Sequence, residues 1–119
     1  MYINQSIGQL GEDKACEYLE KNNYTILERN FRCSQGEIDI IAKDLSKNEL
    51  VFIEVKTRSS FLYGMPSEAV TKIKKRHLLS ASKYYLFKNN ITNSFVRFDV
   101  VEVFPKNYSF ILNHIKQIF

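Results

Sequence analysis

Ionisable residues alternate with large apolar residues in two short segments, residues 36–42 (GEIDIIA) and residues 50–58 (LVFIEVKTR). Successive side chains of a β-strand point to opposite faces of the sheet, so each segment would carry its charges on one face. If the two strands pair antiparallel with Asp39 facing Glu54, the two carboxylates repel each other unless a cation lies between them. Mg²⁺ suits such a place, because it binds carboxylate oxygens, keeps several waters and accepts phosphate oxygens.

Lys56 lies two residues after Glu54 and therefore on the same face of its strand. Its ammonium group could orient an attacking water or stabilise charge on a phosphate that is being transferred. A hairpin with one dry and one wet face shows the same alternation, however. The register that sets Ile41 opposite Phe52 also sets Glu37 opposite Lys56, which would then be an ordinary cross-strand ion pair. The pattern alone leaves both interpretations open, and Glu37 is either an edge carboxylate of a site or an ion-pair partner.

The surrounding sequence predicts the elements that must position these residues. Ser6 and Gln9 have the spacing of a capping box before a helical pattern that ends near Asn22. Runs rich in β-branched and aromatic residues predict four strands, over residues 24–32, 36–42, 50–58 and 96–104. A second helix is predicted from the N-cap Thr71 to Lys88.

This order predicts an α/β fold with the sequence helix, three strands, helix, strand (αβββαβ) and a short C-terminal element. Short links between the first three strands favour an antiparallel meander, and the second helix is a crossover that makes the last two strands parallel. The expected sheet is mixed and four-stranded, with helices packed on it, in a single domain over residues 1–119. The amphipathic tail, residues 108–119, is expected to end in a short helix.

Composition limits the class of protein. The chain has 17 basic and 13 acidic residues, a net charge of +4, and no apolar run of the roughly eighteen residues that a membrane span needs. No secretory signal is recognised at the N-terminus. Two cysteines, Cys16 and Cys33, do not make a disulfide framework, so reduced thiols in a cytoplasmic protein are expected.

Basic residues gather at the start of the second predicted helix. Lys72, Lys75 and Arg76 lie opposite the apolar stripe of that helix, where a solvated helix face is the ordinary interpretation. Lys74 falls inside the stripe, so we expect it to point toward a substrate phosphate or toward the carboxylates. His77 also lies in the stripe and is expected to be buried. The candidate phosphate contacts are Arg32, Arg58, Lys72, Lys74, Lys75 and Arg76. Two aromatic residues of the loop before this helix, Phe61 and Tyr63, either stack on a base or pack locally.

The ordered set of motifs resembles a known family. GEIDIIA, followed by FIEVKTR after a short loop, is similar to the motif of the PD-(D/E)XK, or restriction-endonuclease-like, nucleases. More closely, the chain resembles the YraN family of uncharacterised bacterial proteins, which are similar to archaeal Holliday-junction resolvases. The matching positions cover nearly the whole chain and are residues 11, 12, 15, 26, 27, 30, 32, 36–39, 54–58, 64, 68–70, 74 and 97–100.

This resemblance implies roles for individual residues. Asp39 and Glu54 would bind Mg²⁺ or Mn²⁺, with the Val55 carbonyl as a third ligand, and Lys56 would handle the attacking water. Glu12, at the margin of the buried stripe of the first helix, would face the site and bind the metal through water or a second ion. Without the resemblance, a boundary glutamate that reaches solvent is the commoner case. The proline of the superfamily name is replaced by Ile38, whereas the acid that follows it is retained.

The leading functional hypothesis is a metal-dependent endonuclease that hydrolyses phosphodiester bonds in DNA, with branched DNA as one candidate substrate. The alternative is a non-catalytic nucleic-acid-binding module with the same fold, although such a module would be free to lose Asp39, Glu54 and Lys56. A third interpretation is a purely structural partner of another protein. The resemblance also implies a homodimer, because cutting two strands at once needs two sites. The sequence does not distinguish DNA from RNA as the substrate.

Overall fold

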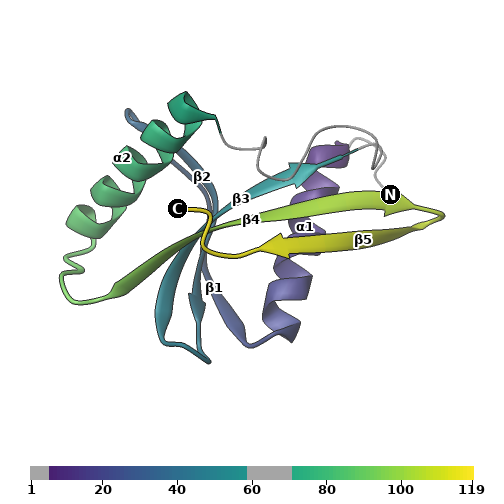
Figure 1. Ribbon diagram of the computed structural model, residues 1–119, viewed down its shortest axis with the longest axis horizontal. Helices are drawn as coiled ribbons and strands as arrows, with labels where there is room; N and C mark the ends of the chain where they lie inside the picture. The colour runs from purple at the N-terminus through teal and green to yellow at the C-terminus, as the bar shows by residue number, and fades with distance from the viewer. Residues whose placement is uncertain (1–5, 59–70) are drawn as a thin grey trace.

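Within residues 6–58 and 71–119, which a computed structural model describes, five strands and two helices form a mixed α/β fold (Figure 1). The elements are α1 (Ile7–Lys21), β1 (Tyr24–Cys33), β2 (Gly36–Asp44), β3 (Glu49–Thr57), α2 (Lys72–Lys88), β4 (Phe95–Lys106) and β5 (Ser109–Ile115). The strands lie in chain order in one sheet. All neighbours pair antiparallel except β3 and β4, which are parallel because α2 connects them.

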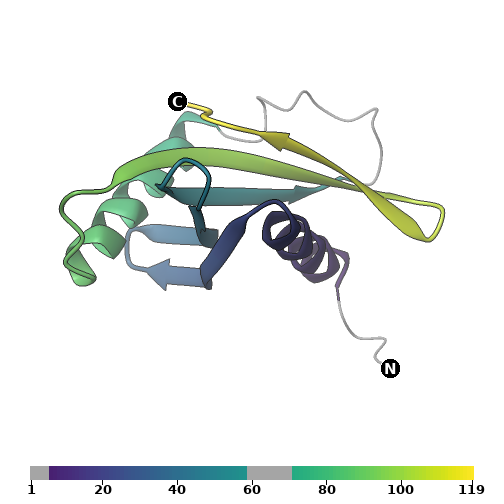
Figure 2. The ribbon, with the colours of Figure 1, turned by 90° about the horizontal axis from the view of Figure 1, so that it is seen from below.

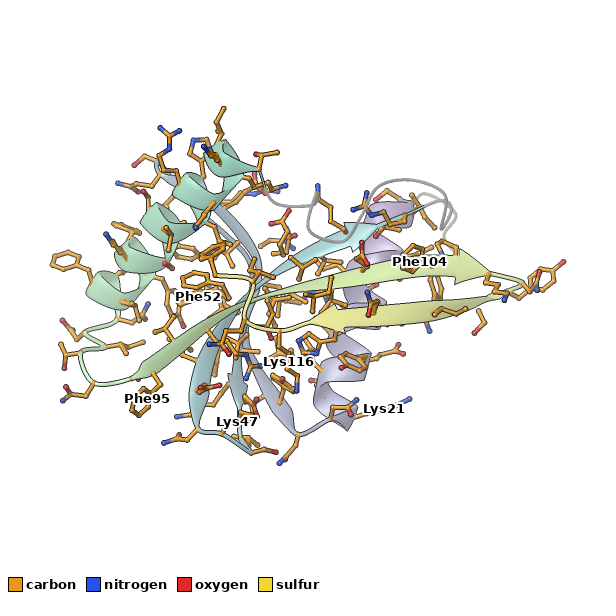
Figure 3. All side chains as sticks on the ribbon, in the orientation of Figure 1. Lys21, Lys47, Phe52, Phe95, Phe104 and Lys116 are labelled. Carbon is orange, nitrogen blue, oxygen red and sulfur yellow. The ribbon has the colours of Figure 1, made fainter. Side chains whose placement is uncertain are left out.

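The two helices pack on opposite faces of the sheet. Leu19 of α1 belongs to a core cluster that contains Ile53, and Leu78 of α2 belongs to a second cluster that contains Phe52. Phe52 and Ile53 are neighbours on β3 and therefore point to opposite faces, which separates the two clusters. Figure 3 labels Phe52 between α2 and the sheet. Neither helix among the described residues is long and apolar enough to cross a membrane.

The predicted α/β class is confirmed, and α1 to β4 follow in the predicted order. The prediction of a four-stranded sheet with a helical tail is wrong, because residues 109–115 form a fifth strand, β5. The reason is the period of the tail. Phe110, Leu112 and His114 are half-buried whereas Ile111 and Asn113 are exposed, and this alternation of two suits a strand at the edge of the sheet.

The apolar stripe predicted for α2 is only partly buried. Leu78 and Tyr85 lie in the core, but Ile73 is 62% exposed and His77 is exposed, so the expectation of a buried His77 is wrong. The start of α2 approaches the sheet at Gly36, where the backbone of His77 would touch any added side chain. Ile73 and His77 consequently line a cleft between α2 and the sheet instead of filling the core.

A buried network of charged residues joins most of the elements. Arg97 of β4 is buried and donates hydrogen bonds to Tyr24, Asp44, Glu49 and Asp99. Asp99 is fully buried and also lies 2.7 Å from His114 Nε2, while the Tyr18 hydroxyl is 2.8 Å from His114 Nδ1. Every element except α2 contributes to this network, so Arg97 and Asp99 have a structural role.

Gly11 allows α1 to approach β3. A Cβ at Gly11 would overlap the Thr57 side chain, whereas a Cβ at Gly8 would meet nothing closer than Ser6 Oγ, 3.9 Å away. Alanine normally stabilises a helix relative to glycine by about 1 kcal/mol. We expect Gly8→Ala to follow that rule and Gly11→Ala to lower the free energy of unfolding by roughly 2 kcal/mol through overpacking. Urea denaturation measures both changes, and Gly11→Ala combined with Thr57→Ala should recover part of the loss. Equal effects of alanine at the two glycines would contradict this packing.

Candidate functional site

Strands β2 and β3 separate partway along their length. Their paired residues end at Ile40 and Ile53, beyond which β2 continues beside β1 and β3 continues beside β4. The Val55 N–H is left without a partner on β2, and the Asp39 carboxylate accepts it at 2.8 Å. We call this opening between Asp39 and Val55, beyond the last paired residues, the fork. The Asp39 carboxylate therefore supplies the hydrogen-bond acceptor that a paired strand would otherwise offer to the Val55 N–H.

The predicted register holds up to the fork and not beyond it. Ile41 lies opposite Phe52, as predicted. Glu37 does not face Lys56, because the strands have separated by then. Its cross-strand neighbour is Arg32 of β1, whose Nε is 3.9 Å from Glu37 Oε1, and both side chains are exposed. Such an exposed pair contributes little to stability.

Glu54 and two lysines meet at the fork. Glu54 is buried, and its Oε2 lies 2.5 Å from Lys74 Nζ, which reaches down from the first turn of α2. Burial and the neighbouring Lys74 lower the pKa of Lys56, and Glu54 acts in the opposite direction. Burial would also lower the pKa of Lys74, but the Glu54 carboxylate outweighs burial and raises it. Lys74 therefore points toward the carboxylates, one of the two directions expected for it.

Asp39 lacks sufficient positive charge around it. Burial raises its pKa from 3.8 to about 7, and repulsion from Glu54 adds to the effect. The Val55 N–H opposes the rise, Glu12 contributes to it, and Lys74 opposes it. The two carboxylates predicted to converge thus interact strongly, and the cation nearest to them in the structure is an ammonium group.

Glu12 approaches the fork from α1 but is held by β1. Its Oε1 accepts hydrogen bonds from Arg29 Nη2 and from Asn30 Nδ2, each at 3.0 Å. Among the described residues, no three His, Cys, Asp or Glu side chains lie close enough together to hold a metal ion. The two carboxylates at the fork are therefore Asp39 and Glu54, and the Val55 N–H is already bound to Asp39. The negative charge of Glu12 contributes to the raised pKa of Asp39.

The fork opens into the cleft described above, whose volume is about 350 Å³. Glu54 and Lys74 line it together with Glu37 and His77. The cleft gives a ligand access to one carboxylate and one ammonium group of the site.

Arg58 is anchored with one donor group left over. Its Nε lies 3.3 Å from Glu102 Oε2, and Asn113 Nδ2 donates to the other oxygen of that buried carboxylate. Arg58 Nη2 is buried and has no hydrogen-bond partner among residues 6–58 and 71–119. A guanidinium held in this way is suited to an anion. Glu102 and Asn113 are not among the residues predicted from the sequence, since nothing in their local pattern indicates that they hold Arg58.

The other predicted basic residues are spread around the site. Lys72, Lys75 and Arg76 are exposed on α2, as the solvated-face interpretation expects, and Lys75 Nζ lies 4.5 Å from the centre of the Phe119 ring. Arg32 is on β1 and does not line the cleft. Phe61 and Tyr63 lie outside the described residues.

The raised pKa of Asp39 predicts how stability depends on pH. Between pH 3.8 and about 7 the folded protein holds a proton on Asp39 that the unfolded chain has lost, so the free energy of unfolding falls as pH rises through this window. Asp39→Asn keeps an acceptor for the Val55 N–H and removes this titration. In EDTA, the wild type should lose roughly 3 kcal/mol more than Asp39→Asn between pH 4.5 and pH 8, measured by urea denaturation. Glu37→Gln, a change at an exposed carboxylate, should follow the wild type. Parallel curves for wild type and Asp39→Asn would show that Asp39 is not electrostatically perturbed.

Comparison with known proteins identifies relatives of unassigned activity. A model of "Uncharacterised protein family UPF0102" matches residues 11–103. The chain is 49% identical over 117 residues to a UPF0102 protein of Caldicellulosiruptor saccharolyticus. The aligned region covers 97% of this chain and 98% of the relative. It is also 54% identical over 103 residues to a UPF0102 protein of Clostridium botulinum strain Hall, and this aligned region covers 86% of the chain and 82% of the relative. The chain therefore belongs to the UPF0102 family, the YraN-type family that its motifs indicate.

Proposed function

We propose that the protein is a metal-dependent nuclease of the PD-(D/E)XK type that hydrolyses phosphodiester bonds in DNA, and that the fork is its active site. The observation that carries this proposal is the meeting of Asp39, Glu54 and Lys56 at one place, with Asp39 short of positive charge. The order from α1 to β4, with parallel β3 and β4, is consistent with a restriction-endonuclease-like fold. Two such sites in a homodimer would allow both strands of a branched substrate to be cut.

The donors at the fork fit a hard divalent cation. Asp39, Glu54 and the Val55 carbonyl offer oxygen atoms only, which Mg²⁺ and Mn²⁺ accept, and Glu12 is placed to contact such an ion through water. Such an ion would act as a Lewis acid on a phosphate oxygen and lower the pKa of a bound water. The chain itself supplies Lys56, whose lowered pKa favours proton exchange with an attacking water.

Further cations lie around the site for the phosphate backbone. Arg58 carries Nη2, which has no partner in the described part of the chain, and Lys72, Lys75 and Arg76 are exposed on the helix that forms one wall of the cleft. Contacts of this kind provide affinity for phosphates without reading the base sequence. They suit an enzyme that recognises the shape of its substrate.

One observation favours the alternative, a non-catalytic nucleic-acid-binding module. The Lys74–Glu54 ion pair already neutralises one of the two carboxylates without a metal. In that case the cluster at the fork would be a structural ion-pair group, and the basic residues alone would serve binding. The behaviour of Lys74 and Lys56 variants separates the two functions.

Lys74→Met tests whether a metal competes with the ammonium group. The variant leaves buried Glu54 without its partner, so in EDTA it should lose about 1–2 kcal/mol of unfolding free energy, a value reduced because Lys74 is partly exposed. Mn²⁺ should then raise the melting temperature of Lys74→Met more than that of the wild type, because no ammonium group has to be displaced. Lys83→Met, on the exposed side of α2, is the control. An unchanged melting temperature of both wild type and Lys74→Met in Mn²⁺ would argue against a metal at the fork.

Lys56→Met separates an enzyme from a binding module. The variant keeps the length of the side chain and should bind Mn²⁺ and DNA as the wild type does, but cleave at least about a hundredfold more slowly. Rates should be measured on linear, nicked, flapped and four-way DNA with Mg²⁺ or Mn²⁺, and with EDTA as the blank. Lys83→Met is again the control variant. Equal rates for wild type and Lys56→Met would exclude Lys56 from the chemistry, and no cleavage by the wild type on any substrate would favour the binding module.

A further inference from the structure

The hairpin between β4 and β5 ends in a strained turn. Lys106 pairs with Ser109, which leaves only Asn107 and Tyr108 in the loop, with φ values of 46° and 65°. Two positive φ values define a type I′ turn, whose second residue is normally glycine. Asparagine tolerates the left-handed conformation, but a bulky side chain with a Cβ is strained there. Tyr108 therefore stands where glycine would give a more stable turn.

Packing does not compensate for this strain. Tyr108 is fully exposed, and Figures 1 and 2 show the hairpin extending beyond the rest of the sheet and past α1. A strained residue that contributes nothing to the core is a candidate for a function outside the chain. An aromatic ring presented to solvent in this way can stack on a flat ligand.

Tyr108 lies at the edge of a hollow between the hairpin and α1, which has a volume of about 400 Å³. Tyr18 and Phe110 supply further aromatic wall, and Lys14 and Lys21 supply positive charge. The hollow does not simply attract anions, because Lys14 Nζ lies 3.4 Å from a Glu17 oxygen in the same wall. Lys21 is the freer cation. It extends from the C-terminal end of α1 (Figure 3) and forms no ion pair with any described residue.

Proteins bind unpaired nucleotides through exposed aromatic rings and positively charged groups, and this hollow offers a group of each kind. The ring stacks on the base and the ammonium group attracts the phosphate, without dependence on base identity. We propose that the hollow binds a short unpaired segment of a nucleic acid, with one base on Tyr108 and the phosphate of a neighbouring nucleotide near Lys21. The choice of nucleic acid as the partner rests on the function proposed above.

The hollow and the fork lie on opposite faces of the sheet. Phe110 and Leu112 pack with the α1 cluster, as Ile53 and Val55 do, so Glu54 and Lys56 point to the other face. Lys56 pairs with Glu102, and Tyr108 lies six residues further along the chain, about 20 Å at the usual rise of a strand. A rigid duplex at the fork could not also enter the hollow. A strand that has left the duplex could pass around the hairpin, so this site would favour flapped or branched DNA.

The test compares two DNAs by fluorescence anisotropy in EDTA, so that cleavage cannot interfere. One is a blunt duplex, and the other is the same duplex with a single-stranded thymine flap. The wild type should bind the flapped DNA more tightly than the blunt duplex. Tyr108→Gly should weaken binding of the flapped DNA at least about fivefold, a low value for the loss of one stacked base, and leave the blunt duplex unchanged. Its melting temperature should not fall, because Asn-Gly suits the turn.

Three further variants sharpen the comparison. Tyr108→Phe keeps the ring and should bind as the wild type does. Phe87→Ala removes another exposed aromatic ring, from α2 and away from the hollow, and should also change nothing. Lys21→Ala should reduce the slope of log affinity against log salt by about one unit for the flapped DNA only.

The inference is overturned if Tyr108→Gly binds the flapped DNA as the wild type does, if it weakens both DNAs equally, or if the wild type shows no preference. A change of oligomeric state in Tyr108→Gly with unaltered DNA binding would assign the ring to a protein contact and also overturn it. Failure of the nuclease proposal is distinguishable, because it would show as a lack of metal-dependent cleavage while the Tyr108-dependent preference remained.

Discussion

Two acidic side chains, one buried and one partly buried, share a place that holds too little positive charge. Asp39 and Glu54 come together where β2 and β3 part, and one lysine from α2 contacts Glu54. The separation of the strands is what makes the place available, since it frees the Val55 N–H for Asp39 and opens a cleft under α2. A fully paired hairpin would have closed this opening with backbone hydrogen bonds. The separation of the two strands therefore brings the carboxylates together and also opens the cleft through which a ligand can reach them.

Asp99, a fully buried aspartate of the same sheet, shows the opposite case, a carboxylate whose hydrogen-bond partners lie within the chain. Asp99 is more deeply buried than Asp39, and burial alone would raise its pKa. Hydrogen bonds from His114, Arg97 and a backbone N–H outweigh burial and lower the pKa instead. Asp99 accepts hydrogen bonds from Arg97, His114 and the Gln117 N–H, whereas Asp39 accepts one hydrogen bond, from the Val55 N–H, among the residues that the structure describes. Asp99 therefore has a structural role, whereas the functional hypothesis rests on Asp39.

The positive groups around the fork are held in different ways, which suggests different tasks. Lys74 binds a carboxylate of the site, and the other basic residues of α2 are solvated. Arg58 is anchored through Glu102, and its Nη2 has no partner among the described residues. A rigid, partly satisfied guanidinium loses little entropy when it binds a phosphate. The exposed lysines add long-range attraction that salt screens. Tyr108, on the far side of the sheet, adds an aromatic surface that electrostatics alone does not provide.

Local sequence determined the α/β class and the order from α1 to β4, because hydrophobic period and helix capping are properties of neighbouring residues. The same alternation placed Asp39, Glu54 and Lys56 on strands. Family membership followed from ordered motifs. The tail was mistaken for a helix because its amphipathic pattern was assigned the wrong period, and only pairing with β4 made it a strand. Likewise His77 is exposed because α2 meets the sheet at Gly36, and Glu37 pairs with Arg32 because β2 leaves β3. The end of the β2–β3 ladder, the Lys74–Glu54 pair and the anchoring of Arg58 depend on distances between segments far apart in the chain, which the tertiary structure alone decides.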